Sequence, residues 1–163
     1  MSSFDVFFIP TIFGCSASTA TISTEITSPA TNQDIQRLQT IAGVGPRLAE
    51  ALVAFLDDPH RFKSSKQVGS YVGLTPRQYQ SGLSDRQGRI SGQGNKLLRT
   101  LLVEISWISL RYNPWAKETY DRLVRGSPSR KNIAIVAVAR KLLVRCWAML
   151  RDKQDWRYGK EAA

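Results

Sequence analysis

The stretch LQTIAGVGPRLAEALVAF, residues 38–55, decides the fold of the first half of this 163-residue chain. Apolar side chains recur at intervals of three or four residues on both sides of the central Gly-Val-Gly, and the spacing extends upstream to Ile35. An α-helix that buries one face shows this spacing. Two short helices joined by a glycine-rich turn are therefore predicted from Asp34 onward, and Pro59 ends the second one.

The turn between these two helices resembles the helix-hairpin-helix DNA-binding motif. Gly43 and Gly45 leave room for the backbone to turn tightly and to approach a phosphate oxygen, while Val44 points back between the helices. Pro46 suits the first position of the second helix, whose free N–H groups attract an anion, and Arg47 adds a positive charge there. Such contacts hold the DNA backbone without reading bases. A purely structural αα-hairpin is the alternative interpretation.

The charge balance favours a polyanionic partner. The chain has 23 Lys and Arg residues against 13 Asp and Glu residues, a formal net charge of +10 and a pI near 10.1. The positive excess is spread from Arg37 to Lys160. Neutralising phosphates releases counterions, so a surface of this kind binds nucleic acid in a salt-dependent way. A solvated basic surface is equally consistent with the charge alone.

Apolar periodicity predicts four more helices downstream. The first begins at Ser64 or Ser65 and includes Tyr71, and the others cover about 93–112, 115–124 and 131–151. The long helix over 93–112 is expected to bury Leu97, Leu98, Leu101, Leu102, Ile105 and Ile108. Between the first two, QYQSGLSDRQGRIS at 78–91 alternates loosely. The predicted fold class is mainly α: a helix-hairpin-helix, then an irregular loop or hairpin, then a three-helix bundle.

The two ends of the chain differ in character from the middle. Residues 1–33 are rich in Ser and Thr, contain no Lys or Arg and show no sustained periodicity, so they are predicted to form an irregular or disordered arm. Residues 34–152 form the predicted domain, and residues 153–163 a flexible tail. The apolar run at 4–15 is too short to span a bilayer, so no membrane contact is expected.

Several kinds of chemistry are disfavoured by composition. Cys15 and Cys146 alone indicate neither a disulfide framework nor a metal cluster, which fits a reducing, cytoplasmic setting. The single His60 excludes sites that need several imidazoles. Glu104 and Asp121 are isolated acids whose spacing demands no metal. No cofactor is therefore expected in this chain.

Ser81 lies on a glycine-flanked turn in the middle of the chain. Cations surround it in the sequence, with Arg77, Arg86 and Arg89 nearby and Lys96 and Arg99 at the start of the next helix. A serine hydroxyl can attack a phosphodiester when guanidinium groups or a metal stabilise the developing charge. On residue types alone, an ordinary turn serine is the commoner interpretation.

Three segments carry a family resemblance. GLTPRQYQSG at 73–82, GRISGQGNKLLRTLLVEISW at 88–107 and NIAIVAVARKLLVRCWAML at 132–150 follow one another in this order. The order closely resembles the C-terminal domain of the insertion-sequence one-ten family of transposases, which are guided by a structured RNA encoded in their own element. The resemblance extends from about Leu38 to Asp152.

The resemblance implies a role for each candidate residue. In that family, a serine just before a glycine is the nucleophile that becomes linked to the cut DNA, and Ser81 occupies this place ahead of Ser84 and Ser91. Arg77, Arg86 and Arg89 would assist at the phosphate. Phosphate contacts are expected from Gly43, Val44, Gly45, Arg47, Lys96 and Arg99. Where the family signature is richer in Lys or Arg, this chain has Gly92-Gln93.

The same resemblance implies a second domain of the ribonuclease-H type, whose four carboxylates bind a divalent metal, expected to be magnesium. The arm holds only Asp5 and Glu25 as acids, so that domain is expected to be missing and the chain to be inactive alone. Expected partners are DNA, a guide RNA, and a full-length transposase or a second copy. The alternative is a non-enzymatic helix-hairpin-helix binding module or a decayed remnant.

Two further features allow more than one interpretation. Trp107, Trp115 and Trp147 lie within apolar helical patterns, so core packing is favoured over base stacking. On the last helix, Arg140, Lys141 and Arg145 leave the apolar stripe and face either nucleic acid or water. The sequence does not distinguish these two outcomes.

Overall fold

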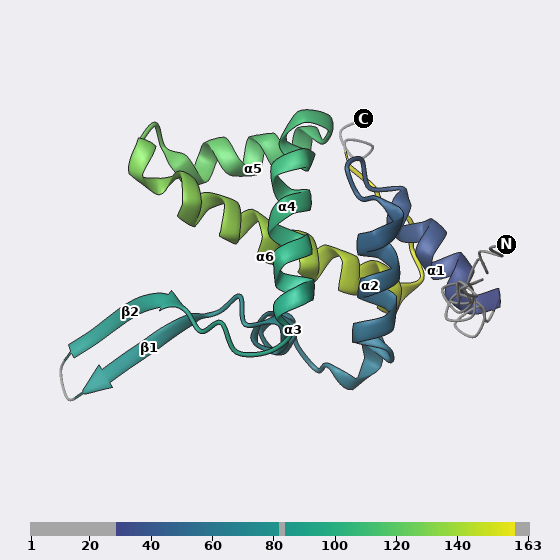
Figure 1. Cartoon of the computed structure of the whole chain (residues 1–163), viewed down its shortest axis with the longest axis horizontal. Helices are drawn as coiled ribbons and strands as arrows, with labels where there is room; N and C mark the ends of the chain where they lie inside the picture. The colour runs from purple at the N-terminus through teal and green to yellow at the C-terminus, as the bar shows by residue number, and fades with distance from the viewer. Residues whose placement is uncertain (1–28, 82–83, 159–163) are drawn as a thin grey trace, which may run out of the picture.

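A computed structural model describes residues 29–81 and 84–158 of the chain (Figure 1). The helices are α1 (Pro29–Gln39), α2 (Pro46–Leu56), α3 (Ser65–Val72), α4 (Lys96–Tyr112), α5 (Pro114–Val124) and α6 (Lys131–Asp152). Two strands, β1 (Pro76–Ser81) and β2 (Ser84–Ile90), form one antiparallel sheet, and 3-10 turns cover Pro59–Arg61 and Pro128–Arg130. The prediction of a mainly α fold is confirmed.

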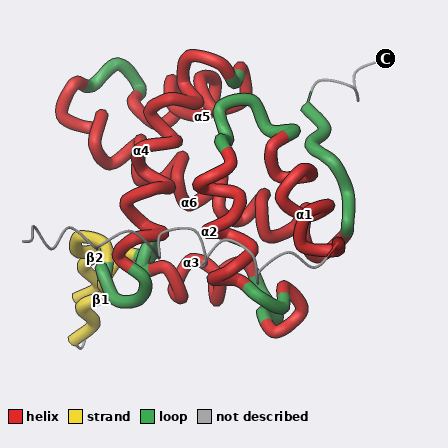
Figure 2. Tube along the Cα trace, turned by 45° about the vertical axis from the view of Figure 1, so that its right-hand side comes forward, coloured by secondary structure: helices red, strands yellow, loops and turns green. Residues whose placement is uncertain are grey.

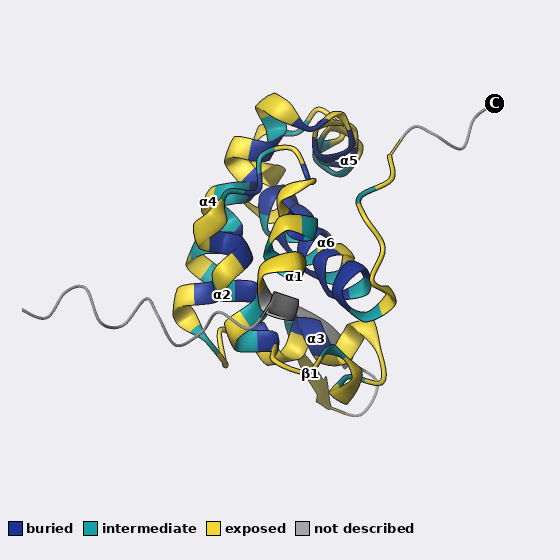
Figure 3. Ribbon diagram, turned by 90° about the vertical axis from the view of Figure 1, so that its right-hand side faces the viewer, coloured by how far each residue is buried: buried dark blue, intermediate teal, exposed yellow. Residues whose placement is uncertain are grey.

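Helix α6 lies in the middle of the other helices (Figure 2). It packs against α1, α3, α4 and α5, while α2 packs against both α1 and α4. The side chains buried between them form one continuous cluster that includes Leu38, Leu52, Leu98, Leu102 and Leu142. Burying a side chain of this size contributes about 1.5–3 kcal/mol. The two helices of the hairpin motif therefore share a single core with α4, α5 and α6, and Figure 3 shows the buried faces turned toward one another.

Helix α4 begins three residues later than the sequence predicts. Gly92 and Gly94 have φ angles of +65° and +98°, which do not belong to an α-helix, and a Cβ at Gly94 would collide with the carbonyl oxygen of Tyr71. Asn95 then caps the helix, because its side-chain oxygen accepts a hydrogen bond from the N–H of Leu98 at 3.1 Å. The close approach to α3 thus sets the start of α4.

The predicted apolar stripe of α4 is partly wrong. Leu97 is 57% exposed and Ile108 is 44% exposed, whereas Ser106 and Ser109 are fully buried. The prediction is right for Leu98 and Leu102, which are fully buried, and Leu101 and Ile105 pack partly buried against the core. Hydrophobic periodicity does not count small polar residues, so it missed Ser106 and Ser109. The core prediction also fails for Trp107, which is 43% exposed and packs on Tyr120, while Trp115 and Trp147 are buried as expected.

The segment predicted as a hairpin or an ordered loop forms two paired antiparallel strands, β1 and β2, one of the two predicted alternatives. The register runs from Pro76 opposite Ile90 to Ser81 opposite Ser84, with an irregularity between Pro76 and Gln78. The ribbon extends away from the helices (Figure 1). The residues that join the strands, 82–83, lie outside the described residues, as do residues 1–28, most of the predicted arm; α1 begins at Pro29, where the sequence predicted arm up to residue 33.

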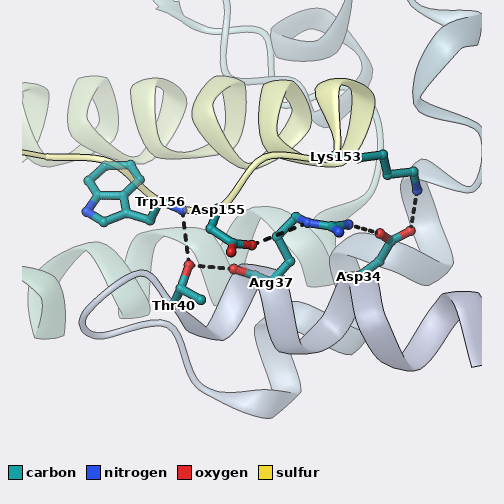
Figure 4. A network of polar contacts seen from close by, with 6 residues as sticks. All are labelled: Asp34, Arg37, Thr40, Lys153, Asp155 and Trp156. Atoms are coloured by element: carbon teal, nitrogen blue, oxygen red, sulfur yellow. Dashed lines mark hydrogen bonds and ion pairs between the residues drawn. The ribbon is translucent and has the colours of Figure 1, made fainter.

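The C-terminal segment 153–158 lies against α1, where the sequence predicts a flexible tail. Figure 4 shows the polar contacts: Lys153 and Arg37 both reach Asp34 at 2.6–2.7 Å, Arg37 also lies 3.4 Å from Asp155, and the N–H of Trp156 donates to the Thr40 hydroxyl at 3.2 Å. Exposed ion pairs stabilise little. The Trp156 ring adds an apolar contact, because it packs edge-on against Trp115 with centroids 5.5 Å apart.

Within the described ranges, no helix is both long and apolar enough to cross a membrane.

Candidate nucleic-acid interface

The turn between α1 and α2 has the shape that the sequence predicts. Gly43 has φ +94°, a conformation that favours glycine, and the N–H of Val44 donates to the carbonyl of Ile41 at 3.0 Å. The side chain of Val44 is buried in the core cluster. The backbone therefore reverses direction within four residues while one apolar side chain anchors the turn.

Gly43 has a structural task that the sequence did not reveal. A Cβ at this position would lie 2.8 Å from the hydroxyl oxygen and 3.0 Å from the Cα of Ser109 on α4. The side-chain amide of Asn113, at the end of α4, also donates to the carbonyl of Ala42 at 3.4 Å. Both contacts fix the turn against α4. Small residues on the buried face of α4 were the available signal for this close approach.

Gly45 has a different environment. No atom beyond its two chain neighbours lies within 4 Å of the place where its Cβ would be, and its φ of −87° is open to any residue. It occupies the N-cap of α2, where it offers no side chain to cap the helix, and Pro46 follows in the first turn. Arg47 is exposed beside it. The first turn of α2 thus combines uncapped backbone N–H groups with a cation and open space, the arrangement that binds anions at helix ends.

Ser81 is exposed at the end of β1, opposite Ser84, and so lies near the tip of the hairpin. Arg77 lies at the base of the same strand, where its guanidinium donates to the carbonyl of Ser91 at 3.1 Å. Four residues of strand separate Ser81 from Arg77, or about 13 Å. Arg89 is exposed at the base of β2. The structure therefore does not bring Arg77 or Arg89 next to Ser81.

The middle of the hairpin carries Tyr79, which is 59% exposed and lies between Arg77 and Ser81 on one face of β1. Its ring covers Gly88 on β2, where a Cβ would approach the ring to 2.8 Å. The backbone of Arg86 pairs with that of Tyr79, and the side chain of Arg86 lies outside the described part of the chain.

The two cations predicted on α4 have unequal environments. Lys96 is exposed in the first turn. Arg99 is partly buried, and its guanidinium donates to the carbonyl of Val72 at 3.0 Å, which fastens α4 to the end of α3. Lys96 is thus available to a ligand, whereas Arg99 holds two helices together.

Within the described part of the chain, the cysteine, the histidine and the acidic side chains form no competing metal site. Burial raises the pKa of the Cys146 thiol to about 12, so it is protonated and unreactive near neutral pH. His60 is exposed on the turn after α2. Across residues 29–81 and 84–158, no three His, Cys, Asp or Glu side chains are grouped as a metal site requires.

Comparison with known proteins identifies a family and several proteins to which this chain is similar. The sequence model of the family described as Transposase IS116/IS110/IS902 matches residues 35–121. The chain is 37% identical to the transposase for insertion sequence element IS1111A of Coxiella burnetii over 136 residues, which cover 78% of this chain and 36% of the relative. It is 34% identical to a probable family 20 transposase of Pseudomonas aeruginosa over 127 residues, covering 77% and 38%.

A third relative, the pilin gene-inverting protein of Moraxella bovis, is 33% identical over 131 residues, which cover 79% of this chain and 40% of the relative. The chain thus matches between a third and two fifths of the length of these curated relatives.

Proposed function

Because the chain belongs to the IS116/IS110/IS902 family of transposases, we propose that it is the DNA-binding, serine-bearing part of an insertion-sequence transposase. In this role the turn between α1 and α2 holds a DNA backbone, and the β1–β2 hairpin presents Ser81 to the strand that is cut. The outcome is transposition or a related DNA rearrangement, as the name of the pilin gene-inverting relatives suggests.

The observation that carries the DNA-binding half of the proposal is the open space at Gly45. The turn packs closely against Ser109 and accepts a hydrogen bond from Asn113, while no atom beyond the chain neighbours of Gly45 lies within 4 Å of its Cβ position. A phosphate oxygen can therefore approach the N–H groups at the start of α2, with Arg47 and Lys96 as exposed cations that add long-range attraction.

The strand-cutting half of the proposal rests on Ser81. Its hydroxyl oxygen forms a bond to phosphorus while its proton passes to a general base. One P–O bond of the DNA backbone breaks, and the departing oxygen takes a proton from a general acid to leave as a hydroxyl. The phosphodiester is exchanged, not hydrolysed, so the reverse reaction can join the strand to a new end. An isolated serine hydroxyl is a poor nucleophile, so a base and charge stabilisation must be supplied.

The described residues do not fit the divalent metal that the family resemblance implies, because they hold no group of three metal-ligating side chains. In our proposal the carboxylates come from a full-length relative acting in trans, and the same assembly would bring in any guide RNA. The chain alone then binds DNA without cutting it.

One observation favours the second candidate function, a non-enzymatic DNA-binding module. Arg77 is engaged with Ser91 at the base of the hairpin, away from Ser81 at its tip. In this arrangement the hairpin would be a binding arm, and Ser81 an ordinary turn residue.

DNA binding is tested at Gly45 and not at Gly43, whose replacement would disturb the fold. We expect Gly45→Leu to leave the melting temperature unchanged but to block phosphate approach. Losing one or two charge-assisted hydrogen bonds costs about 1.5–3 kcal/mol, so affinity for an arbitrary DNA duplex should fall about tenfold or more. The measurement is fluorescence anisotropy over a salt series with purified protein.

The matched control is Ala54→Leu, which adds a side chain of the same size at another exposed position of α2. It should bind as the parent chain does. Equal affinities for Gly45→Leu and Ala54→Leu would exclude the turn as the phosphate contact, and absence of salt-dependent binding by the parent chain would refute DNA binding altogether.

A further inference from the structure

A cleft of about 640 Å³ lies between α5 and α6. These two helices belong to the C-terminal half of the chain, whereas the turn between α1 and α2 belongs to the N-terminal half. Helix α5 contributes Trp115, Glu118 and Arg122, and helix α6 contributes Arg140, Lys141 and Arg145. Trp115, Glu118 and Arg122 are spaced by three and four residues and share one face of α5. Lys141 and Arg145 are four residues apart and share one face of α6, with Arg140 at its edge. Figure 3 shows α5, α6 and the C-terminal segment on one side of the molecule and α2 and α4 on the other.

The charges of this cleft do not cancel. Its one carboxylate, Glu118, accepts hydrogen bonds from Arg122 at 2.8 Å and from the hydroxyl of Tyr158 at 2.6 Å. The Tyr158 hydrogen bond and the pairing with Arg122 lower the pKa of Glu118, so it is ionised and neutralises Arg122. Arg140, Lys141 and Arg145 form no ion pair with any side chain that the structure describes.

Arg145 is held in place by aromatic rings and not by an acid. Its guanidinium carbon lies 5.0 Å from the centroid of Trp115 and 5.3 Å from that of Trp156. Cation–π contacts restrain the side chain and leave its N–H donors free. Ordering a long side chain before a ligand arrives lowers the entropy cost of binding.

Arg140 is restrained in a different way. It lies across Gly69 of α3, where a Cβ would approach its Nε to 3.2 Å. The missing side chain at Gly69 therefore makes room for this arginine at the edge of the cleft. Two of the three unpaired cations are thus positioned by the fold, which a merely solvated basic face would not require.

The spacing of the cations indicates the kind of anion. Arg140 and Arg145 are five residues apart, or about 7.5 Å along the helix axis. Phosphates on one strand follow at about 3.4 Å of axial rise. Neighbouring phosphates lie farther apart in space than this rise, because the strand also winds around the axis. The row is therefore long enough for two neighbouring phosphates and exceeds the need of a single small anion.

We propose that the α5–α6 cleft binds the phosphodiester backbone of a nucleic acid through Arg140, Lys141 and Arg145, as a second contact besides the turn between α1 and α2. The inference rests on the proposed nucleic-acid-binding function, but it concerns different residues. Duplex DNA, single-stranded DNA and RNA share this backbone chemistry, and the experiment distinguishes them.

The test compares two charge-matched variants of the full chain. Lys141→Gln with Arg145→Gln removes two cations from the cleft, and Lys117→Gln with Arg130→Gln removes two exposed cations outside it. Binding of each is measured by anisotropy over a salt series to a 30-nucleotide random sequence, supplied as duplex DNA, single-stranded DNA and single-stranded RNA. Poly-glutamate of similar charge serves as a non-nucleic polyanion.

Each phosphate contact contributes about 0.9 to the slope of log affinity against log salt for duplex DNA and about 0.7 for a single strand. We expect the cleft variant to lower the slope by about one to two with at least one nucleic acid, and the control by less than half of that. The nucleic acid with the largest loss is the occupant.

The proposal would be overturned if the cleft variant and the control variant lost the same amount of salt slope with every nucleic acid. It would also be overturned if the cleft variant lost as much slope with poly-glutamate as with nucleic acid. The single change Lys141→Gln controls for misfolding caused by the change at Arg145. Lys141 is exposed and forms no hydrogen bond or ion pair among the described side chains, so its replacement should give about half the loss of salt slope of the double variant. Gly45→Leu run beside these variants separates the two sites: loss there alone supports the turn and rejects the cleft, and loss in the cleft variant alone does the reverse.

Discussion

Gly43 and Gly45 look alike in the sequence, yet they serve different ends. Gly43 adopts a left-handed conformation and faces Ser109, whereas Gly45 is extended and open to solvent. Sequence reasoning predicted that both glycines lie in the turn, and the structure confirms this. It could not assign their roles, because the partner of Gly43 lies 66 residues away on a helix whose buried serines carry no hydrophobic signal.

This division predicts opposite stability effects for the same substitution. Gly43→Ala should lower the free energy of unfolding by about 1–3 kcal/mol, because it adds left-handed backbone strain and a clash with Ser109. Gly45→Ala should be neutral or stabilising by up to about 1 kcal/mol through the unfolded chain. Urea unfolding followed by circular dichroism measures both.

Ser109→Ala provides the control for the clash. It removes a buried hydroxyl that has no hydrogen-bond partner among the described residues, so alone it should not destabilise the chain. Combined with Gly43→Ala, it should recover part of the loss. If the two changes are strictly additive, the contact between Gly43 and Ser109 does not explain the glycine.

At the scale of elements, hydrophobic periodicity predicted the helices well and the two strands poorly. It located α5 and α6 to within a residue at each end, because Asn113-Pro114 and Gly126 interrupt two regular patterns. It left residues 78–91 undecided between loop and hairpin, because β1 is exposed along both faces from Arg77 to Ser81 and offers no apolar alternation to detect. The same lack of burial explains why the mutual positions of Ser81 and Arg77 could not be predicted.

The hairpin makes its own prediction, since it extends from the helices and holds Ser81 at its exposed end. Ser81→Ala should change neither the melting temperature nor DNA affinity, because the side chain supports no packing. In a reaction completed by a full-length transposase relative whose own serine is replaced, the change should abolish covalent protein–DNA linkage. Denaturing gel electrophoresis of labelled DNA measures the linkage.

Ser91→Ala is the matched control, at a serine in the segment that follows β2. It should retain the linkage if Ser81 is the nucleophile. Linkage that survives Ser81→Ala, or is lost equally in Ser91→Ala, would favour the binding-module function over strand cutting.

The shared core predicts that the described helices unfold as one cooperative unit. The sequence predicted a helix-hairpin-helix followed by a bundle, which leaves open whether the two fold separately, because a periodic pattern shows which face is buried but not what covers it. The structure joins them through α2 against α4 and α1 against α6. All four tryptophans, Trp107, Trp115, Trp147 and Trp156, lie outside α1 and α2.

This distribution of tryptophans allows cooperativity to be measured. Leu52 on α2 is fully buried, so Leu52→Ala should cost about 2–5 kcal/mol. In a single cooperative unit, the urea midpoint seen by tryptophan fluorescence must fall as far as the midpoint seen by circular dichroism, although no tryptophan lies on the mutated helix. Leu97→Ala, at an exposed leucine of α4, should change the free energy of unfolding seen by either probe by no more than about 0.5 kcal/mol. If Leu52→Ala leaves the fluorescence midpoint unchanged, α1 and α2 unfold separately from the other helices. The contacts of the phosphate-facing turn with Ser109 and Asn113 would then be lost before the bundle unfolds.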